Sequence, residues 1–339
     1  VRVRLAKDGT IASIYDIEHA RETLAGPANR LLLWEDYPYS WDAWDISHYY
    51  RETTPEQAKL VSRTVVETGP LRAVIAQRLT VGGSTIDQLI VLEAGSRLVR
   101  IDNTAEWNES HKQLRVAAEP AVHALTATYE IQFGAVSRPG HANTSWDAAQ
   151  FEVAAQRFAD VSQADYGFGV VNDCKYGHSF RDGIIDLTLL RSPKDPDPVA
   201  DIGTHEFAFG YYPHSGTWSQ SELLETAHEL NSPPLVSRSA DRSASSSWFD
   251  VAGGRVKVET VKLAEDRKGM ILRLYETRGE TQRVVLRSAL ALDGMVEVDL
   301  LEQGNAKVKA ARASGDARYA SEVALEFGPY QIRSFRIGR

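Results

Sequence analysis

The chain has 339 residues, a length that predicts about two domains at roughly 100 to 200 residues each. Charged residues make up 25% and apolar residues 43% of the sequence, which is the balance of a globular protein with a buried core. The 38 Lys and Arg against 46 Asp and Glu give a net charge of −8. We therefore expect neither nucleic acid nor a membrane as a partner, since both attract basic surfaces.

Alternation of apolar and polar residues with a period of two is the dominant pattern, and it predicts strands. The clearest runs, in chain order, are 1–5, 86–91, 98–101, 256–261 and 296–300. Turn dipeptides that predict hairpins separate such runs, at Asp8-Gly9, Gly82-Gly83, Gly253-Gly254, Arg278-Gly279 and Asp293-Gly294. Short helices are predicted only at 54–61 and 219–230. The pattern as a whole predicts an all-β fold of large sheets packed face to face.

A serine-rich stretch predicts the boundary between two domains. The sixteen residues 232–247 contain seven serines and two adjacent prolines, a composition typical of a linker or loop. We therefore predict a first domain over 1–231, a linker or loop over 232–247, and a second domain over 248–339. The chain begins at Val1 and contains only two methionines, so we expect it to be a piece of a longer protein.

Aromatic and acidic residues are concentrated in the segment 35–46. The candidate side chains there are Trp41, Asp42, Trp44 and Asp45. Aromatic rings stack on the apolar face of a pyranose while carboxylates accept hydrogen bonds from its hydroxyls, so this composition is typical of a sugar site. A packed loop that closes the end of a sandwich has the same composition, and the sequence leaves both interpretations open. Nor does it identify catalytic carboxylates, because a glycosidase pair must lie about 5 to 9.5 Å apart in space.

Two further segments, 138–147 and 166–178, combine turn residues with His, Trp, Tyr and Lys. Their candidate pocket residues are His141, Trp146 and Asp147 in the first, and Asp173, Lys175, Tyr176 and His178 in the second. Glycines that alternate with aromatic residues in the second segment indicate a close approach of the backbone to a neighbour. Either segment is predicted to line a pocket or, equally, to be structural.

Metal and nucleophile motifs are missing from the sequence. Nine His are scattered without a His-Glu-x-x-His pair, and neither a phosphate-binding loop nor a Gly-x-Ser-x-Gly motif occurs in a usable context. Cys174 is the single cysteine, which excludes an internal disulfide and favours a reducing cytoplasm. A nucleophilic Cys174 would need its pKa lowered, for which Lys175 is the nearest candidate. The residues predict neither a metal site nor a catalytic group in this chain.

Several blocks of sequence resemble the C-terminal region of family 38 glycoside hydrolases, the α-mannosidases of the bacterial and cytosolic type. The blocks lie at 29–38, 41–46, 106–112, 130–134, 143–147, 172–178, 189–193, 195–198, 213–214, 259–262 and 327–333. They follow the family's order and cover essentially the whole chain.

This resemblance implies a parent enzyme that is a retaining exo-α-mannosidase of the EC 3.2.1.24 type, acting on terminal α-mannose residues in mannose metabolism. In the family, an N-terminal part holds a Zn²⁺ ion through two Asp and two His and also supplies the catalytic Asp residues. None of that set is found here. The resemblance thus implies an isolated chain that is inactive and contains no zinc site, with the N-terminal catalytic part of the same polypeptide as its partner and an α-mannoside as the substrate. We expect a cytoplasmic, bacterial location, and homo-oligomerisation of the parent stays open.

The resemblance also implies a specific architecture. In the family this region is a large β-super-sandwich, similar to the galactose-mutarotase-like sandwiches, followed by a small β-sandwich. Loops of the first domain reach the rim of the sugar pocket, and we expect 41–45 and 173–178 to occupy those positions, with Lys175 as the cation. Two other interpretations remain: an autonomous carbohydrate-binding module, and a purely structural domain that docks on the catalytic part.

Overall fold

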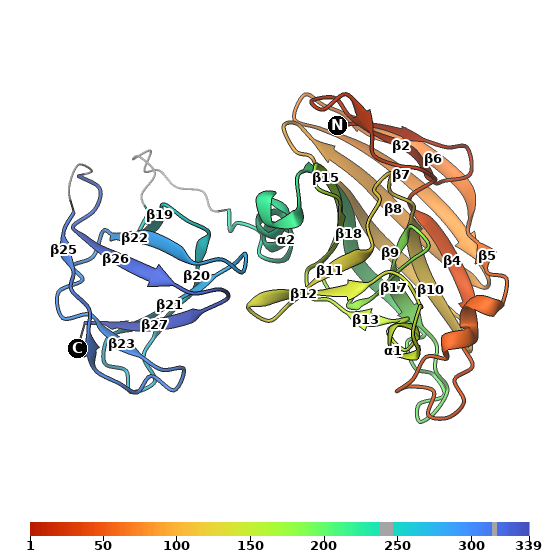
Figure 1. Ribbon diagram of the computed structural model, residues 1–339. Helices are drawn as coiled ribbons and strands as arrows, with labels where there is room; N and C mark the ends of the chain where they lie inside the picture. The colour runs from red at the N-terminus through yellow and green to blue at the C-terminus, as the bar shows by residue number, and fades with distance from the viewer. Residues whose placement is uncertain (237–246, 314–316, 339) are drawn as a thin grey trace. The chain divides into compact units, whose positions relative to one another are not determined.

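The computed structural model describes residues 1–236, 247–313 and 317–338. Strands dominate this part of the chain, which confirms the predicted all-β fold (Figure 1). The chain divides into two compact units, Val1–Ile131 with Val136–Pro234, and Gln132–Ala135 with Leu235–Arg339. Most of the predicted linker, residues 237–246, lies outside the described residues.

The first unit contains two large antiparallel sheets and a small one. The six-stranded sheet has the order β13 (Val153–Ala154), β16 (Gly177–Arg181), β17 (Ile184–Arg191), β10 (Lys112–Ala118), β4 (Arg30–Glu35), β5 (Glu56–Gln57). The nine-stranded sheet has the order β12 (Gly134–Pro139), β11 (Thr126–Ile131), β14 (Phe158–Ser162), β15 (Tyr166–Asn172), β18 (Gly203–Ser215), β9 (Val99–Trp107), β8 (Ser84–Glu93), β7 (Arg72–Val81), β6 (Lys59–Thr68). The small sheet is β1 (Arg2–Leu5), β2 (Ile11–Asp16), β3 (Arg21–Glu22).

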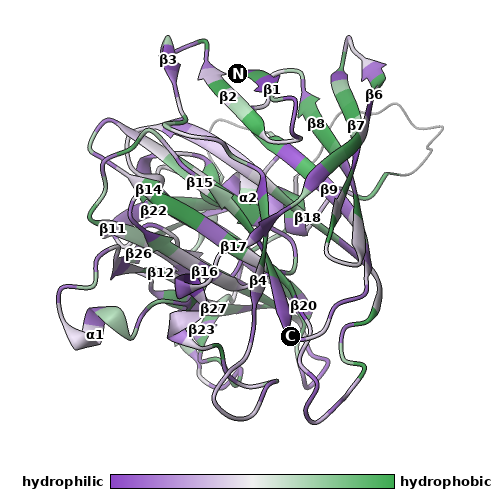
Figure 2. Ribbon diagram, turned by 90° about the vertical axis from the view of Figure 1, so that its right-hand side faces the viewer, coloured by the Kyte–Doolittle hydropathy of each residue, from purple (hydrophilic) through white to green (hydrophobic). Residues whose placement is uncertain are grey.

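The two large sheets bury their apolar faces in a common core. Along β9 every second residue is buried, from Val99 through Ile101 and Ala105 to Trp107. Figure 2 shows hydrophobic and hydrophilic residues interleaved along the strands of the nine-stranded sheet. Because side chains alternate between the faces of a strand, this pattern places one face on the core and leaves the other polar.

A buried amide network crosses the core side of the nine-stranded sheet. The Gln88 Nε2 atom donates to Asn103 Oδ1 at 2.9 Å, and the Gln77 Nε2 atom donates to Gln88 Oε1 at 2.8 Å. Asn29, which precedes β4, adds a donor to the same Gln88 oxygen at 2.8 Å. Buried amides are costly unless paired, so these contacts fix the register of the three strands and tie the two sheets together.

A short helix covers the outer face of the nine-stranded sheet. The helix α2 (Leu223–Asn231) packs Leu223, Leu224 and Ala227 against this face, and the 3₁₀ turn η2 (Trp218–Gln220) precedes it. Gly167 in β15 allows a close approach there: a Cβ at this position would lie 2.2 Å from His214 Cε1 and 2.5 Å from Ser162 Oγ. The absence of a side chain at Gly167 therefore allows its neighbours to pack closely against the strand.

The second unit is a smaller sandwich of two sheets. One has the order β19 (Phe249–Ala252), β22 (Gln282–Ser288), β26 (Ser321–Phe327), β25 (Ala311–Arg312). The other has the order β20 (Val256–Leu263), β21 (Met270–Glu276), β27 (Ile332–Ile337), β23 (Val296–Val298), β24 (Ala306–Lys307). Leu272, Leu286 and Phe327 lie in the apolar core of this sandwich.

Of the two predicted helices, the one at 219–230 is confirmed and the one at 54–61 is wrong. The chain there forms β5 and the start of β6, because Ala58 N donates to Leu31 O at 2.9 Å and draws the segment into the six-stranded sheet. Two other short helical elements are η1 (His48–Glu52) and α1 (Ser145–Ala148). Among the described residues, no helix has the length and apolar character needed to cross a membrane.

Substituting Gly167→Ala should destabilise the first unit by about 1 to 3 kcal/mol, because the added methyl group displaces His214 or Ser162. Urea unfolding followed by tryptophan fluorescence measures the loss. Gly328→Ala is the control, since a Cβ there would meet only Gln331 Oε1, at 3.9 Å. Equal stability of the two variants would contradict this account of the close packing.

Candidate functional site

The segment 36–47, which follows β4, is held at the end of the six-stranded sheet by one arginine. The Arg191 Nε atom donates to Asp36 Oδ2 at 2.7 Å. Its Nη2 atom donates to the backbone carbonyls of Asp42 at 3.1 Å and Asp45 at 2.6 Å. Burial raises the pKa of Asp36, and Arg191 offsets part of that rise. Because Arg191 is the last residue of β17, the loop is fixed directly to the sheet.

Asp42 joins the same loop to two other segments. Its Oδ2 atom lies 3.1 Å from His111 Nε2 and accepts a hydrogen bond of 3.1 Å from the backbone N–H of Lys194. The imidazole of His111 stacks on the ring of Tyr37 with centroids 4.8 Å apart. We call residues 36–47 and 191–202 together the end loops. Figure 1 shows the two segments on the same side of the first unit, beyond β4 and β17.

The end loops expose aromatic rings. Trp41 is 64% exposed and Trp44 is 70% exposed, and their rings meet edge to face with centroids 5.8 Å apart. Trp41 has a φ of +62°, a conformation that is costly for a bulky residue, and its carbonyl accepts a hydrogen bond from Trp44 N at 2.9 Å. The backbone is thus bent in a way that presents both indoles to the surface.

The second predicted segment forms a capped helical turn. Asp147 accepts hydrogen bonds from Thr144 in a capping box at the start of α1, and its carboxylate lies 3.5 Å from His141 Nδ1. Trp146 is 82% exposed. The stretch that follows α1 reaches η1, the element directly after the first segment, through Phe151, whose ring meets that of His48 with centroids 6.1 Å apart.

The third predicted segment divides between surface and interior. Asp173 is bound to β18, since its Oδ2 atom accepts a hydrogen bond from Ala208 N at 3.0 Å. Lys175 Nζ lies 4.8 Å from the centroid of the Phe207 ring, and Tyr176 is 54% exposed. His178 lies on β16 with 0% of its surface exposed, so its assignment to a pocket rim is wrong. Its neighbour across the strands is Leu187, a core residue, which explains the burial.

Cys174, which follows Asp173, is not an activated thiol. Burial raises its pKa to about 11, and a hydrogen bond with Asp173 acts in the same direction and outweighs the opposite effect of Lys175. A thiol with so high a pKa is protonated at neutral pH and is a poor nucleophile.

The structure brings four further residues to this site, which no sequence motif indicates: Asp36, His111, Arg191 and Lys194. Asp36 belongs to the acidic and aromatic segment, but the other three are distant from it in the sequence. No local pattern predicts that they meet. Their roles depend on the pairing of β10 with both β4 and β17, which brings residues 35, 112 and 191 together at one end of the strands.

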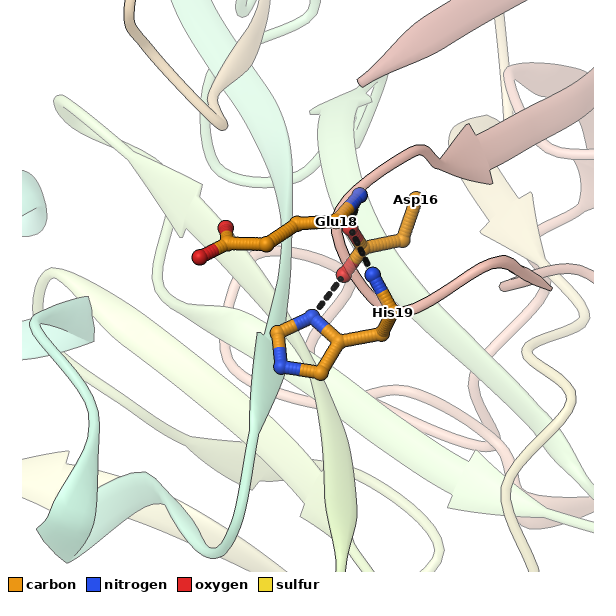
Figure 3. A group of neighbouring side chains, drawn as sticks. All are labelled: Asp16, Glu18 and His19. Carbon is orange, nitrogen blue, oxygen red and sulfur yellow. Dashed lines mark hydrogen bonds and ion pairs between the residues drawn. The ribbon is translucent and has the colours of Figure 1, made fainter.

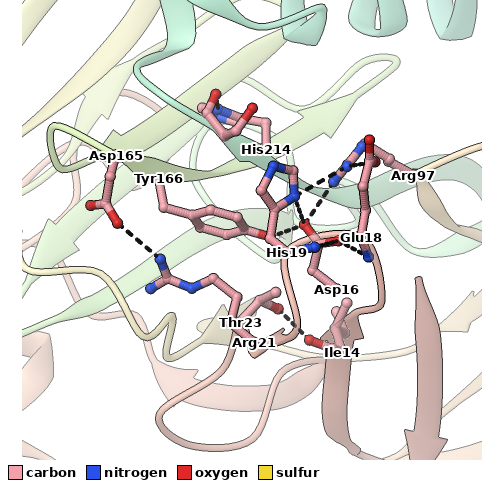
Figure 4. Close-up of polar contacts among 11 residues, drawn as sticks. Ile14, Asp16, Glu18, His19, Arg21, Thr23, Arg97, Asp165, Tyr166 and His214 are labelled. Carbon is pink, nitrogen blue, oxygen red and sulfur yellow. Dashed lines mark hydrogen bonds and ion pairs between the residues drawn. The ribbon is translucent and has the colours of Figure 1, made fainter.

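Three side chains at the turn after β2 form the one group, within the described part of the chain, whose geometry could hold a metal ion: Asp16, Glu18 and His19 (Figure 3). Figure 4 shows that the carboxylate of Asp16 already has several hydrogen-bonding partners. Its Oδ2 atom lies 2.6 Å from Tyr166 Oη, 2.8 Å from Arg97 Nη1 and 2.9 Å from His19 Nδ1. Burial acts to raise the pKa of Asp16, but these hydrogen bonds hold it far below its usual range. A guanidinium in contact with the carboxylate disfavours the binding of a cation there. We therefore interpret this group as structural, with Asp16 connecting the turn to Arg97 and Tyr166.

Comparisons with known proteins agree with this architecture. The model of the Glycosyl hydrolases family 38 C-terminal domain matches residues 1–199, and that of the Glycosyl hydrolases family 38 C-terminal beta sandwich domain matches 255–335. The chain is 37% identical to alpha-mannosidase 2C1 of Homo sapiens, over 98% of this chain and 32% of that protein. It is 32% identical to alpha-mannosidase G of Dictyostelium discoideum, over 99% of this chain and 32% of that protein. It thus spans about a third of the length of these relatives.

Solved structures give the same fold. An alpha-mannosidase from Enterococcus faecalis V583 superimposes with a TM-score of 0.77, over 99% of this chain and 41% of that chain. The sequence identity is 15%, so this likeness supports the architecture of the sandwiches.

Replacing Arg191 by Lys should loosen the end loops. A lysine keeps the charge but cannot reach Asp36 and two carbonyls at once. We expect hydrogen exchange in residues 41–46 to accelerate by about tenfold while the core strands are unchanged. Arg283→Lys is the control, since that arginine is exposed and pairs only at the surface with Glu326. Unchanged exchange in 41–46 would contradict the anchoring role.

His178 predicts a pH-dependent stability. Burial lowers its pKa from the ordinary value of 6.5 to about 4, so the imidazole is neutral in the folded chain. The unfolded chain takes up a proton at His178 below pH 6.5. The contribution of His178 to the free energy of unfolding is therefore fully present above pH 6.5 and is lost as the pH drops toward 4. The expected loss is roughly 3 kcal/mol. Urea unfolding of the protein and of His178→Gln at about pH 7 and about pH 4 measures the difference. An identical pH dependence of the two proteins would contradict a neutral buried His178.

Proposed function

Because the chain belongs to the family 38 glycoside hydrolases as their C-terminal region, we propose that it completes a retaining, zinc-dependent exo-α-mannosidase without supplying a catalytic group. In this proposal the N-terminal part of the polypeptide binds Zn²⁺ and cleaves terminal α-mannose residues. The present chain stabilises the enzyme and lines the rim of its sugar pocket. The single cysteine supports a cytoplasmic location.

Those residues of the chain that the structure describes do not fit the zinc site of such an enzyme. Asp16, Glu18 and His19 are the one candidate group in the described ranges, and Arg97 contacts all three: Asp16 at 2.8 Å, His19 at 3.4 Å, and the Glu18 carboxylate. A catalytic zinc site needs three protein ligands and an open position for water. This mismatch supports the assignment of the metal and of the catalytic carboxylates to the rest of the polypeptide.

The main support for a role at the pocket rim is the pair of exposed indoles, Trp41 and Trp44. Their loop is fixed by the hydrogen bonds of Arg191. Exposing two aromatic rings to water on a bent, anchored loop costs free energy. A sugar or a protein surface that packs on the rings would recover that free energy. The adjacent carboxylate of Asp42 and the imidazole of His111 add polar groups at the same place. This combination favours contact with a pyranose at the rim.

Two alternatives make different predictions for the same surface. An autonomous carbohydrate-binding module would bind mannose without the rest of the enzyme. A purely structural domain would use the indoles only to dock on the catalytic part. The exposed rings are compatible with both, and the experiments below separate them.

The isolated chain should not hydrolyse an aryl α-mannoside, with or without added Zn²⁺, because its one candidate metal group among the described residues is occupied by Arg97. A chromogenic assay of the purified protein tests this, with the full-length polypeptide as the positive control. Metal-dependent turnover by the isolated chain would refute the proposal. In calorimetry we expect no mannose binding in the millimolar range, and tight binding would favour the module instead.

In the full-length enzyme, Trp44→Ala should raise KM for an α-mannoside by about tenfold, since a lost stacking contact weakens substrate binding. Trp248→Ala is the matched control, because that indole is 62% exposed and lies in the second unit. Gel filtration and thermal unfolding check the assembly. Lost assembly in Trp44→Ala would favour docking, and unchanged kinetics with intact assembly would contradict the rim function.

A further inference from the structure

A buried cluster of charged side chains lies on the outer face of the six-stranded sheet, away from the apolar core. Arg115 on β10 is 1% exposed, and its Nε atom donates to Asp186 Oδ1 on β17 at 3.0 Å. Its Nη1 atom donates to Glu152 Oε2 and to Thr188 Oγ1, both at 2.6 Å. One guanidinium thus binds two carboxylates and a hydroxyl.

Two of the partners come from segments that cover the sheet. Arg51 belongs to η1, and its Nη2 atom donates to Asp186 Oδ2 at 2.8 Å and to Ser179 Oγ. Glu152 follows α1, and its second carboxylate oxygen accepts a hydrogen bond of 2.8 Å from Thr188. The cluster has two positive and two negative charges, and it joins both covering segments to the sheet.

The covering segments also contact each other and pack on the sheet. His48 and Phe151 meet with ring centroids 6.1 Å apart. Tyr50 is 3% exposed, and its ring meets that of Trp34 on β4 edge to face with centroids 5.4 Å apart. The guanidinium of Arg115 lies 5.5 Å from the centre of the Tyr50 ring, so the same arginine supports the covering segment by a second contact.

Stability alone does not explain such a cluster. Burying charges is costly, and apolar residues of similar volume often stabilise a fold as well or better. A buried ionic cluster does specify one arrangement, because any displacement of a covering segment leaves a charge unpaired. The covering segments are continuous with the loops that expose Trp41, Trp44 and Trp146. The position of these indoles is thus coupled to the cluster.

We propose that Arg115 is a positioning residue, which sets the place of the aromatic rim by locking residues 48–52 and 149–152 onto the six-stranded sheet. It touches no substrate itself, since its side chain is buried. This inference rests on the proposed rim function for its effect on sugar binding. The locking of the two segments can be tested independently of that function.

The test compares variants that keep the charges of the cluster balanced with one that does not. Arg115→Met leaves two carboxylates facing one arginine and is expected to fold poorly. The double variant Arg115→Met with Glu152→Met removes one charge of each sign and keeps the pair of Arg51 and Asp186, so it should remain folded. Arg115→Lys keeps the charge but loses the forked guanidinium that binds several partners at once. Its stability should lie between those of the other two variants. Arg97→Met is the control, because it breaks the buried pair with Asp16, a contact that involves neither covering segment.

Two readouts separate the two claims. Hydrogen exchange should accelerate about tenfold in residues 41–52 and 144–152 of the double variant, but not in the Arg97→Met control. In the full-length enzyme the same variant should raise KM by about tenfold with kcat changed less than threefold. Native exchange in both segments, or equal acceleration in the control, would overturn the role of Arg115. Accelerated exchange with an unchanged KM would instead overturn the rim function.

Discussion

The six-stranded sheet is covered by other parts of the chain on both of its faces. The arrangement of the first unit depends on this constraint. An antiparallel sheet usually buries one face and leaves the other in water. Here β10 is buried along nearly its whole length, with Leu114 and Val116 facing the core and Gln113 and Arg115 facing outward. Arg115 is charged, so whatever covers it must supply partners for its hydrogen bonds and its charge. The segments that contribute Glu152 and Tyr50 to it are continuous with the loops that carry the candidate site.

This constraint links the fold to the proposed function. Arg191 binds the first end loop by its backbone carbonyls. Arg115 binds Glu152 of one covering segment directly, and it shares Asp186 with Arg51 of the other. Both arginines project from strands that the core already fixes. The exposed indoles are therefore placed by a rigid sheet through short polar contacts. Loops held in this way can present a defined surface to a sugar or to another part of the polypeptide, which a free loop cannot do without losing more conformational entropy.

The sequence predicted the class of fold, because the period of two along strands such as β9 follows directly from burial of one face. It failed at 54–61, where pairing with β4 overrides a weak helical pattern. It found the acidic and aromatic segment but placed His178 at the surface, since a histidine next to exposed Tyr176 gives no local sign that its strand faces the core. It also missed His111 and Arg191 as partners of this segment. Their contacts depend on strand pairs whose partners lie about 80 residues apart in the sequence, which no local pattern encodes.

The central claim is that the end loops form part of a sugar pocket completed by the rest of the polypeptide. Its most direct test is hydrogen exchange of the full-length enzyme with and without a competitive inhibitor that occupies the mannose site. The account predicts slower exchange in residues 36–47 on inhibitor binding, with no change in the strands of the second unit. Identical exchange in 36–47 with and without a saturating inhibitor would contradict it.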